Sequence, residues 1–292
     1  MKVPGRGIVT LASGDDRFQH WAKYLLMSLR KHDPSVRTAV VTDVPDSPHL
    51  AGFDQIVLLD PSRGDAYAQK LWLPEYSPFV ETLFLDADCM VYQDLREVWE
   101  SLEDGPIVGL AARSVTKPKW CKDVSSLPEK YQVKSYLEFN GGLVYWRYDD
   151  EVREIFEEAR DIFDNHYEEF GLHLFGPRRG DEPALALAMS RRRIPSIHEH
   201  RHSMRGLSGL SGQPRLRIAE GIAEFIKHDE LVEPAIVHFT GSGTPARALH
   251  SHEMMALRLL DLGVPPQWCH LLTPAALAVQ RRRAAVQHLV RK

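Results

Sequence analysis

Two aspartates stand two positions apart, directly after an apolar segment in the first third of the chain. Residues 80–85 read Val-Glu-Thr-Leu-Phe-Leu, and Asp86-Ala87-Asp88 follow. Because side chains on a strand alternate faces, we expect both carboxylates to point the same way at the exposed carboxyl end of a strand. Anionic oxygens placed there suit Mg²⁺ or Mn²⁺, ions that also bind water and substrate phosphates. The spacing therefore predicts a divalent-metal site.

Three other segments carry residues that fit such a site. Lys70 precedes the apolar strand and could reach the same phosphates. Asn140-Gly141-Gly142 lead into another apolar run, and paired glycines let the backbone approach a ligand closely. His238 ends a third apolar run beside a glycine and could be the third metal ligand. Each segment alone also has a purely structural reading; only the combination with the two aspartates favours ligand binding.

Acidic and histidine-rich segments in the second half offer further candidates. Asp181 and Glu182 begin a helical pattern, where the helix dipole alone would favour them. In a functional reading, Asp181 accepts hydrogen bonds from sugar hydroxyls and Glu182 stabilises an oxocarbenium-like centre. His198, His200 and His202 could face one way and bind a transition metal, but a basic loop lined with histidine explains them equally well.

Composition limits the class of protein. The 292 residues are 43% hydrophobic and 26% charged, which suits a large α/β domain or two smaller ones. A formal charge of -4 argues against a nucleic-acid binder. Three widely spaced cysteines encode no disulfide framework and indicate a reducing compartment. No run approaches the roughly 20 apolar residues of a membrane span, nor a signal-peptide core. We expect a cytoplasmic protein that could touch the inner face of a membrane.

Short apolar runs alternate with helical patterns along the first third of the chain. This rhythm predicts a mostly parallel sheet covered by helices, with strands or helices at 8–12, 18–31, 38–42, 56–59 and 82–85. The last two strands are apolar throughout, which predicts burial on both faces. Open α/β sheets bind ligands at the carboxyl ends of their strands, where the two aspartates stand.

The second half continues the alternation, with helices expected at 95–102, 152–163 and 183–189 and strands at 107–111, 143–146 and 235–239. Residues 203–214 contain three glycines and read as a loop, either a lid or a plain surface connection. The tail, 274–292, carries five basic residues and no acid. It predicts a helix that lies on an anionic membrane surface or packs on the protein's own body.

Taken in order, these segments resemble the nucleotide-sugar glycosyltransferases of the GT-A fold, and within them glycosyltransferase family 8, over about residues 7–247. The resemblance implies an α/β, Rossmann-like GT-A domain with a mixed, mostly parallel central sheet flanked by helices, and C-terminal helices. It implies one domain over 1–250, with a nucleotide-binding half at about 1–95 and an acceptor-binding half at about 96–250. Residues 251–292 would form the basic helical tail.

The same resemblance implies an activity and a set of site residues. A hexose would move from a nucleoside-diphosphate sugar, most simply a UDP-sugar, to a carbohydrate or other hydroxyl acceptor with retention of configuration. Mn²⁺ or Mg²⁺ would be held by Asp86, Asp88 and His238, with Asp181 and Glu182 at the reacting carbon. The residues implied to contact the donor are Thr10, Leu11, Ala12, Ser13, Lys70, Asp86, Ala87, Asn140, Gly141, Gly142, Gly241 and Arg247.

Two positions depart from the family pattern. A Lys-Pro-Trp motif usually closes the family's site, but this chain has Thr244-Pro245-Ala246, so Arg247 would have to replace the lysine. Glu182 stands where the family usually has glutamine, which would strengthen stabilisation of a cationic centre or allow a covalent intermediate.

Three other functions remain open from the sequence. A haloacid-dehalogenase-type phosphatase also uses Asp-x-Asp after a strand, although Met90 and the late position of the motif fit that class poorly. A sugar nucleotidyltransferase is suggested by 12–17, which lacks that class's second glycine. A catalytically degenerate carbohydrate-binding protein would explain the missing lysine.

Overall fold

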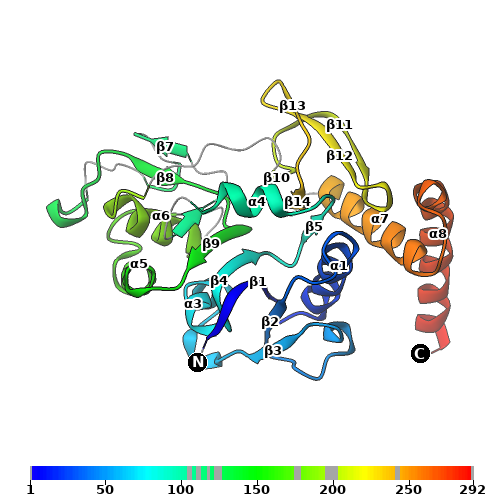
Figure 1. The fold of residues 1–292 in the computed structure, drawn as a ribbon, viewed down its shortest axis with the longest axis horizontal. Helices are drawn as coiled ribbons and strands as arrows, with labels where there is room; N and C mark the ends of the chain where they lie inside the picture. The colour runs from blue at the N-terminus through cyan, green and yellow to red at the C-terminus, as the bar shows by residue number, and fades with distance from the viewer. Residues whose placement is uncertain are drawn as a thin grey trace.

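A mixed six-stranded sheet forms the centre of the computed structural model, which describes residues 2–103, 107–109, 113–116, 119–121, 127–173, 179–194, 203–240 and 244–290 (Figure 1). The strand order is β3-β2-β1-β4-β9-β6. The first four are parallel, whereas β9 runs antiparallel to both β4 and β6. The strands are β1 (Val3–Leu11), β2 (Thr38–Thr42), β3 (Gln55–Leu58), β4 (Phe79–Leu85), β6 (Ile107–Gly109) and β9 (Leu143–Arg147). The predicted mixed, mostly parallel α/β architecture is confirmed.

Helices cover both faces of this sheet. Alternate residues of β4 belong to different cores: Phe84 packs with α5 and α6 on one face, and Leu83 packs with α1 and α4 on the other. Burial on both faces is why consecutive residues at the end of this strand, Leu83, Phe84 and Leu85, are all apolar. The helices of the first two thirds are α1 (Asp16–His32), α2 (Ala66–Lys70), α3 (Leu73–Tyr76), α4 (Arg96–Ser101), α5 (Asp150–Asp161) and α6 (Asp181–Arg191).

The expectation for the third strand is wrong. Apolar residues at 56–59 predicted burial on both faces, but Ile56 is 43% exposed and Leu58 is 64% exposed. The strand lies at the edge of the sheet, paired on one side only with β2. Composition alone does not distinguish an edge strand from a central one.

The predicted loop at 203–214 is largely strand, so that expectation is also wrong. Met204–Gly206 forms β10 and pairs in parallel with β14 (Ile236–His238), which pairs antiparallel with β5 (Cys89–Val91). Leu210–Arg217 forms β11 in a second small sheet. The backbone hydrogen bonds of β10 come from pairing with β14, about 30 residues further along the chain, which the local sequence of β10 does not predict. The other strands of the small sheets are β12 (Ile222–Lys227) and β13 (Glu230–Val232), and β7 (Arg113–Val115) with β8 (Tyr136–Glu138).

Two C-terminal helices lie on the side of α1, away from α5 and α6 (Figure 1). They are α7 (Thr244–Asp261) and α8 (Pro266–Val290). The tail is therefore helical as far as Val290. The sequence predicted that this helix begins at Pro274, but it begins eight residues earlier, at Pro266. None of the helices in the described part of the chain combines the length and apolarity needed to cross a bilayer.

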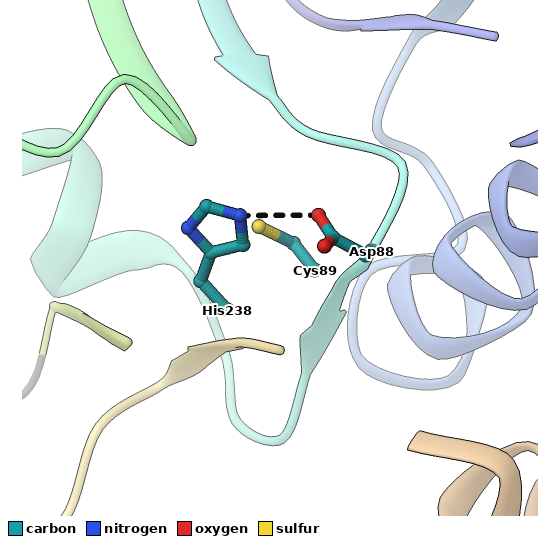
Figure 2. Close-up of side chains that lie close together, drawn as sticks. All are labelled: Asp88, Cys89 and His238. Atoms are coloured by element: carbon teal, nitrogen blue, oxygen red, sulfur yellow. Dashed lines mark ion pairs between the residues drawn. The ribbon is translucent and has the colours of Figure 1, made fainter. Parts of the chain in front are cut away.

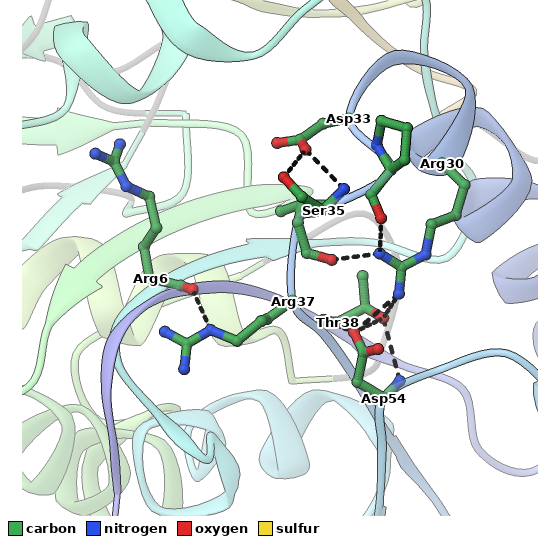
Figure 3. Close-up of polar contacts among 9 residues, drawn as sticks. Arg6, Arg30, Asp33, Ser35, Arg37, Thr38 and Asp54 are labelled. Atoms are coloured by element: carbon green, nitrogen blue, oxygen red, sulfur yellow. Dashed lines mark hydrogen bonds and ion pairs between the residues drawn. The ribbon is translucent and has the colours of Figure 1, made fainter.

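A polar network fixes the end of the sheet opposite the aspartates (Figure 3). Asp54 accepts hydrogen bonds from the Thr38 amide at 2.7 Å and from Arg30 Nη2 at 2.9 Å. Burial acts to raise the pKa of Asp54, but these donors outweigh it and lower that pKa. Arg37 Nε donates to the Arg6 carbonyl at 3.2 Å. These contacts hold β1, β2 and β3 in register.

Candidate active site

The two aspartates lie in a turn between two sheets. Asp86 follows the last residue of β4, and Ala87 and Asp88 turn the chain into β5. The Cys89 amide donates to the Asp86 carbonyl at 2.9 Å and closes the turn. We expected Asp86 and Asp88 to point the same way because they lie on an extended strand, and this is wrong. They lie in a turn, and the turn directs both carboxylates toward the same histidine. The Asp86 amide donates to the Gly142 carbonyl at 2.9 Å, which ties the turn to the glycine segment.

His238 meets both aspartates because β14 pairs with β5 in a register that sets His238 opposite Cys89. Its Nε2 lies 3.1 Å from Asp88 Oδ1 (Figure 2) and 3.5 Å from Asp86 Oδ2. Burial acts to lower the pKa of His238, but the Asp88 carboxylate outweighs it and raises that pKa. The same pair lowers the pKa of Asp88 to about 2 against the opposing effect of burial. The arrangement is a buried imidazole held between two anions.

Asn140 determines which ring nitrogen of His238 is free. Asn140 Oδ1 accepts the Gly142 amide at 2.9 Å and lies 3.0 Å from His238 Nδ1. Because this oxygen can only accept, Nδ1 must carry the proton and donate. When the ring is neutral, as a metal ligand must be, its lone pair is on Nε2, which faces Asp86 and Asp88. Orientation of a ligating histidine by a hydrogen bond to its other nitrogen is characteristic of metal sites.

Both glycines after Asn140 are required by close packing. A Cβ at Gly142 would lie 2.2 Å from the ring of His238, and one at Gly141 would lie 2.8 Å from Glu182 Cγ. The Gly141 amide donates to Glu182 Oε1 at 2.6 Å. The segment therefore joins the predicted metal ligands to the predicted catalytic acids.

Lys70 ends α2 and pairs with the first aspartate. Its Nζ lies 2.7 Å from Asp86 Oδ1 and 3.0 Å from Oδ2. Burial acts to lower the pKa of Lys70, but the charges of Asp181 and Asp86 outweigh it and raise the pKa above its usual value. A permanent positive charge therefore stands beside the aspartates, where an anionic ligand could pair with it.

Asp181 and Glu182 occupy the first turn of α6. Asp181 is 4% exposed, and burial raises its pKa above the ordinary value. Burial, assisted by repulsion from Asp181, raises the pKa of Glu182 to about 7. Near neutral pH this side chain is therefore partly a neutral acid, which resembles the amide expected at this position more than a carboxylate would.

A cavity of about 380 Å³ opens beside Lys70, Asp86 and Asp88. Of the residues expected to contact a donor, Leu11, Ser13 and Ala87 line it. Thr10 and Ala12 are buried and do not line it. Sequence reasoning missed four residues that also line this cavity, namely Arg17, Phe18, Ala66 and Tyr67. In the sequence these residues form two pairs in which an aromatic residue follows a basic or a small one. Such pairs are too common to indicate a binding site.

Several sequence candidates lie apart from this cluster or outside the described residues. Arg247 is exposed in the first turn of α7. Gly241 falls outside the part of the chain that the structure describes, as do His198, His200 and His202.

No family model and no curated protein matches the sequence. Solved structures do match the fold. An active-site mutant of LgtC aligns with a TM-score of 0.53 and 13% identity, covering 90% of this chain and 99% of that one. The galactosyltransferase LgtC in complex with donor and acceptor sugar analogs aligns with a TM-score of 0.53 and 13% identity, covering 89% and 98%. The chain has the GT-A fold.

The GT-A fold also brings His250 to the site, which sequence reasoning missed. His250 is 3% exposed on α7 and packs against Trp21 and Phe239. Burial lowers its pKa to about 4, so the ring is neutral at pH 7, and its Nε2 is buried with no hydrogen-bond partner among the described residues. Fourteen histidines are scattered through the sequence, and only the packing of α7 distinguishes this one.

Proposed function

We propose that this protein is a metal-dependent glycosyltransferase that moves a hexose from a nucleoside-diphosphate sugar, a UDP-sugar, to a hydroxyl acceptor. The observation that carries the proposal is the meeting of Asp86, Asp88 and His238 beside Lys70, with both aspartates and the lysine at the wall of one cavity. Those residues come from three separated segments, so chance apposition of two acids does not explain them. The GT-A fold supports the same proposal.

The donor set fits Mn²⁺ or Mg²⁺. Adjacent ligands of an octahedral ion with bonds of about 2.1 Å lie about 3.0 Å apart, and the histidine-to-aspartate separations are 3.1 and 3.5 Å. Cys89 lies beside this set (Figure 2), but its thiol donates to the Gly142 carbonyl at 3.6 Å, and burial raises its pKa well above the ordinary value. A protonated thiol is a poor ligand, so Asp86, Asp88 and His238 would hold the ion. When bound, it would neutralise charge on a departing diphosphate.

The residues around the ion would position the donor. Lys70 would bind the diphosphate oxygens, because its charge is held at the cavity wall by Asp86. Leu11 and Ser13 would contact the nucleoside, with Phe18 and Tyr67 offering aromatic faces for a base.

At the reacting carbon, Asp181 would accept hydrogen bonds from sugar hydroxyls and Glu182 would face the developing cation. The Gly141 amide holds Glu182 Oε1 at 2.6 Å and so fixes the direction of the carboxyl group. Ionised Glu182 would stabilise positive charge at this carbon more strongly than an amide. We propose retention of configuration at this centre.

The proposed domain organisation places a nucleotide-binding half at 1–95, an acceptor-binding half at 96–250 and a tail at 251–292. Within the tail, α8 exposes several large apolar side chains, namely Trp268 (50%), Leu271 (66%), Leu272 (44%) and Val279 (52%). Arg281 and Arg282 follow and are exposed as well. This combination favours a peripheral contact with an anionic membrane surface.

The test is hydrolysis or transfer with a panel of UDP-sugars in the presence of Mn²⁺, repeated with EDTA. We expect turnover with Mn²⁺, none with EDTA, and none in Asp88→Asn. The exposed Asp46→Asn is the matched control and keeps full activity. Metal-independent turnover that survives in Asp88→Asn would refute the proposal.

Three other outcomes identify the rival functions. Pyrophosphate formation from a nucleoside triphosphate and a sugar phosphate identifies a nucleotidyltransferase. Phosphate release from an aryl phosphate identifies a phosphatase, which the GT-A fold disfavours. Sugar binding in calorimetry without Mn²⁺-dependent UDP binding identifies a degenerate transferase.

A further inference from the structure

A second cluster of ligand-type side chains lies far along the chain from the aspartates, where α7 meets α8. Glu253 Oε1 is 3.3 Å from His252 Nδ1 and 3.5 Å from His270 Nδ1. One ligand atom from each of the three residues lies within 4.8 Å of the others. The two imidazole rings are nearly parallel, with centroids 5.4 Å apart, so both Nδ1 atoms approach one carboxylate oxygen.

The rest of the fold holds this carboxylate in place. Glu253 is 1% exposed, and its Oε2 accepts the Ile218 amide at 2.7 Å and the Tyr92 hydroxyl at 3.1 Å. Oε1 is thereby turned toward the histidines. Among the described residues, the ion pairs of Glu253 involve only those two rings. A buried carboxylate without a permanent positive partner is costly unless a cation joins it.

His270 is partly buried. Its side chain is 9% exposed, and neither ring nitrogen makes a hydrogen bond to any described residue. A buried ring nitrogen without a hydrogen bond is costly unless a ligand binds it.

We propose that His252, Glu253 and His270 bind a zinc ion that fastens α8 to α7 and to the body of the protein. Ligand atoms about 2.0–2.1 Å from a tetrahedral zinc lie about 3.3 Å apart, and the observed separations are 3.3 and 3.5 Å. Two imidazole nitrogens and one carboxylate favour zinc over Mg²⁺ or Ca²⁺, which prefer oxygen ligands. The hydrogen bonds to Glu253 Oε2 supply the orienting contacts that a ligating carboxylate usually has. A water molecule would take the fourth position.

The experiment uses the full chain without a histidine tag, carrying Asp88→Asn so that the first site is disabled. The protein is stripped with chelator, dialysed against Zn²⁺ and analysed for metal; Co²⁺ is added in parallel. We expect one zinc per chain, intense Co²⁺ absorption bands of a tetrahedral site, and a higher melting temperature with zinc.

Further substitution of His252→Gln should weaken zinc binding at least 100-fold and abolish the tetrahedral Co²⁺ bands. His252 is 31% exposed, so its replacement should leave the circular dichroism of the metal-free protein unchanged. The matched control is His173→Gln, which removes an exposed histidine and should keep one zinc per chain. Absence of zinc from the Asp88→Asn protein, or equal binding after His252→Gln, would overturn the proposal.

Discussion

Replacing Gly142 by alanine should displace the histidine of the proposed metal site without straining the backbone. Gly142 is not among the residues with a left-handed backbone, so an L side chain can adopt its conformation. The added methyl group, however, would lie 2.2 Å from Cε1 and Nδ1 of His238. The ring must move, and its motion breaks the contacts with Asn140 and Asp88 that orient it.

The size of the effect follows from the geometry. Ordinary contacts begin at 3.4 Å, and 3.4 Å less 2.2 Å means that the ring must retreat by about 1.2 Å. A misplacement of about 1 Å at a reacting centre costs on the order of 100-fold in rate. This loss corresponds to about 2.7 kcal/mol of transition-state stabilisation. We also expect Mn²⁺ affinity to fall by about 10- to 100-fold, as it does when the orientation of a ligand is lost.

The assay pairs Mn²⁺ affinity, read from the electron paramagnetic resonance signal of free Mn²⁺, with kcat/KM for UDP-sugar hydrolysis. Gly141→Ala is the informative partner, because its methyl group would meet Glu182 and not the histidine. It should reduce turnover while leaving Mn²⁺ affinity intact. Gly209→Ala, with nothing within 4 Å of its added Cβ, should only lose stability from its positive φ of 73°. Wild-type Mn²⁺ affinity in Gly142→Ala would refute this reasoning.

Three further predictions concern the charges of the site and the tail. In the wild-type protein kcat/KM should rise through about pH 7, where Glu182 ionises, and Glu182→Gln should abolish this rise. Burial raises the pKa of Glu182 above its unfolded value of 4.5, so the stability of the wild-type protein falls as the pH rises from 4.5 through 7. The advantage of the variant in Tm should therefore grow over that range. An unchanged pH profile would contradict the assignment. Lys70→Met should raise the donor KM by about tenfold or more, since one charged hydrogen bond is worth roughly 1.5–3 kcal/mol, and an unaltered KM would remove Lys70 from the donor site. Truncation after Thr273 should abolish flotation with anionic liposomes, and equal flotation of both proteins would show that the tail has no such role.

Much of the fold could be predicted because local patterns and tertiary packing agree. Thr38–Thr42 is buried at every position, and its bounds are those of the predicted strand. The start of α1 is likewise local, since Asp15 caps the helix by accepting the Arg17 amide. Where the environment decides, local patterns failed: β3 is an edge strand, and β10 forms only because β14 lies beside it.

The sequence by itself determined which chemistry is available, because carboxylates, an ammonium group and an imidazole were recognisable from residue type and order. It also predicted their assembly at one edge of a parallel sheet. The tertiary structure alone decided how they meet. A turn directs Asp86 and Asp88 to the same side, and the register between β14 and β5 places His238 beside them. Packing alone revealed His250 and the cluster around Glu253, where His270 on α8 joins the adjacent His252 and Glu253 on α7. Distances between residues remote in sequence depend on strand register and helix packing, and no local pattern encodes those.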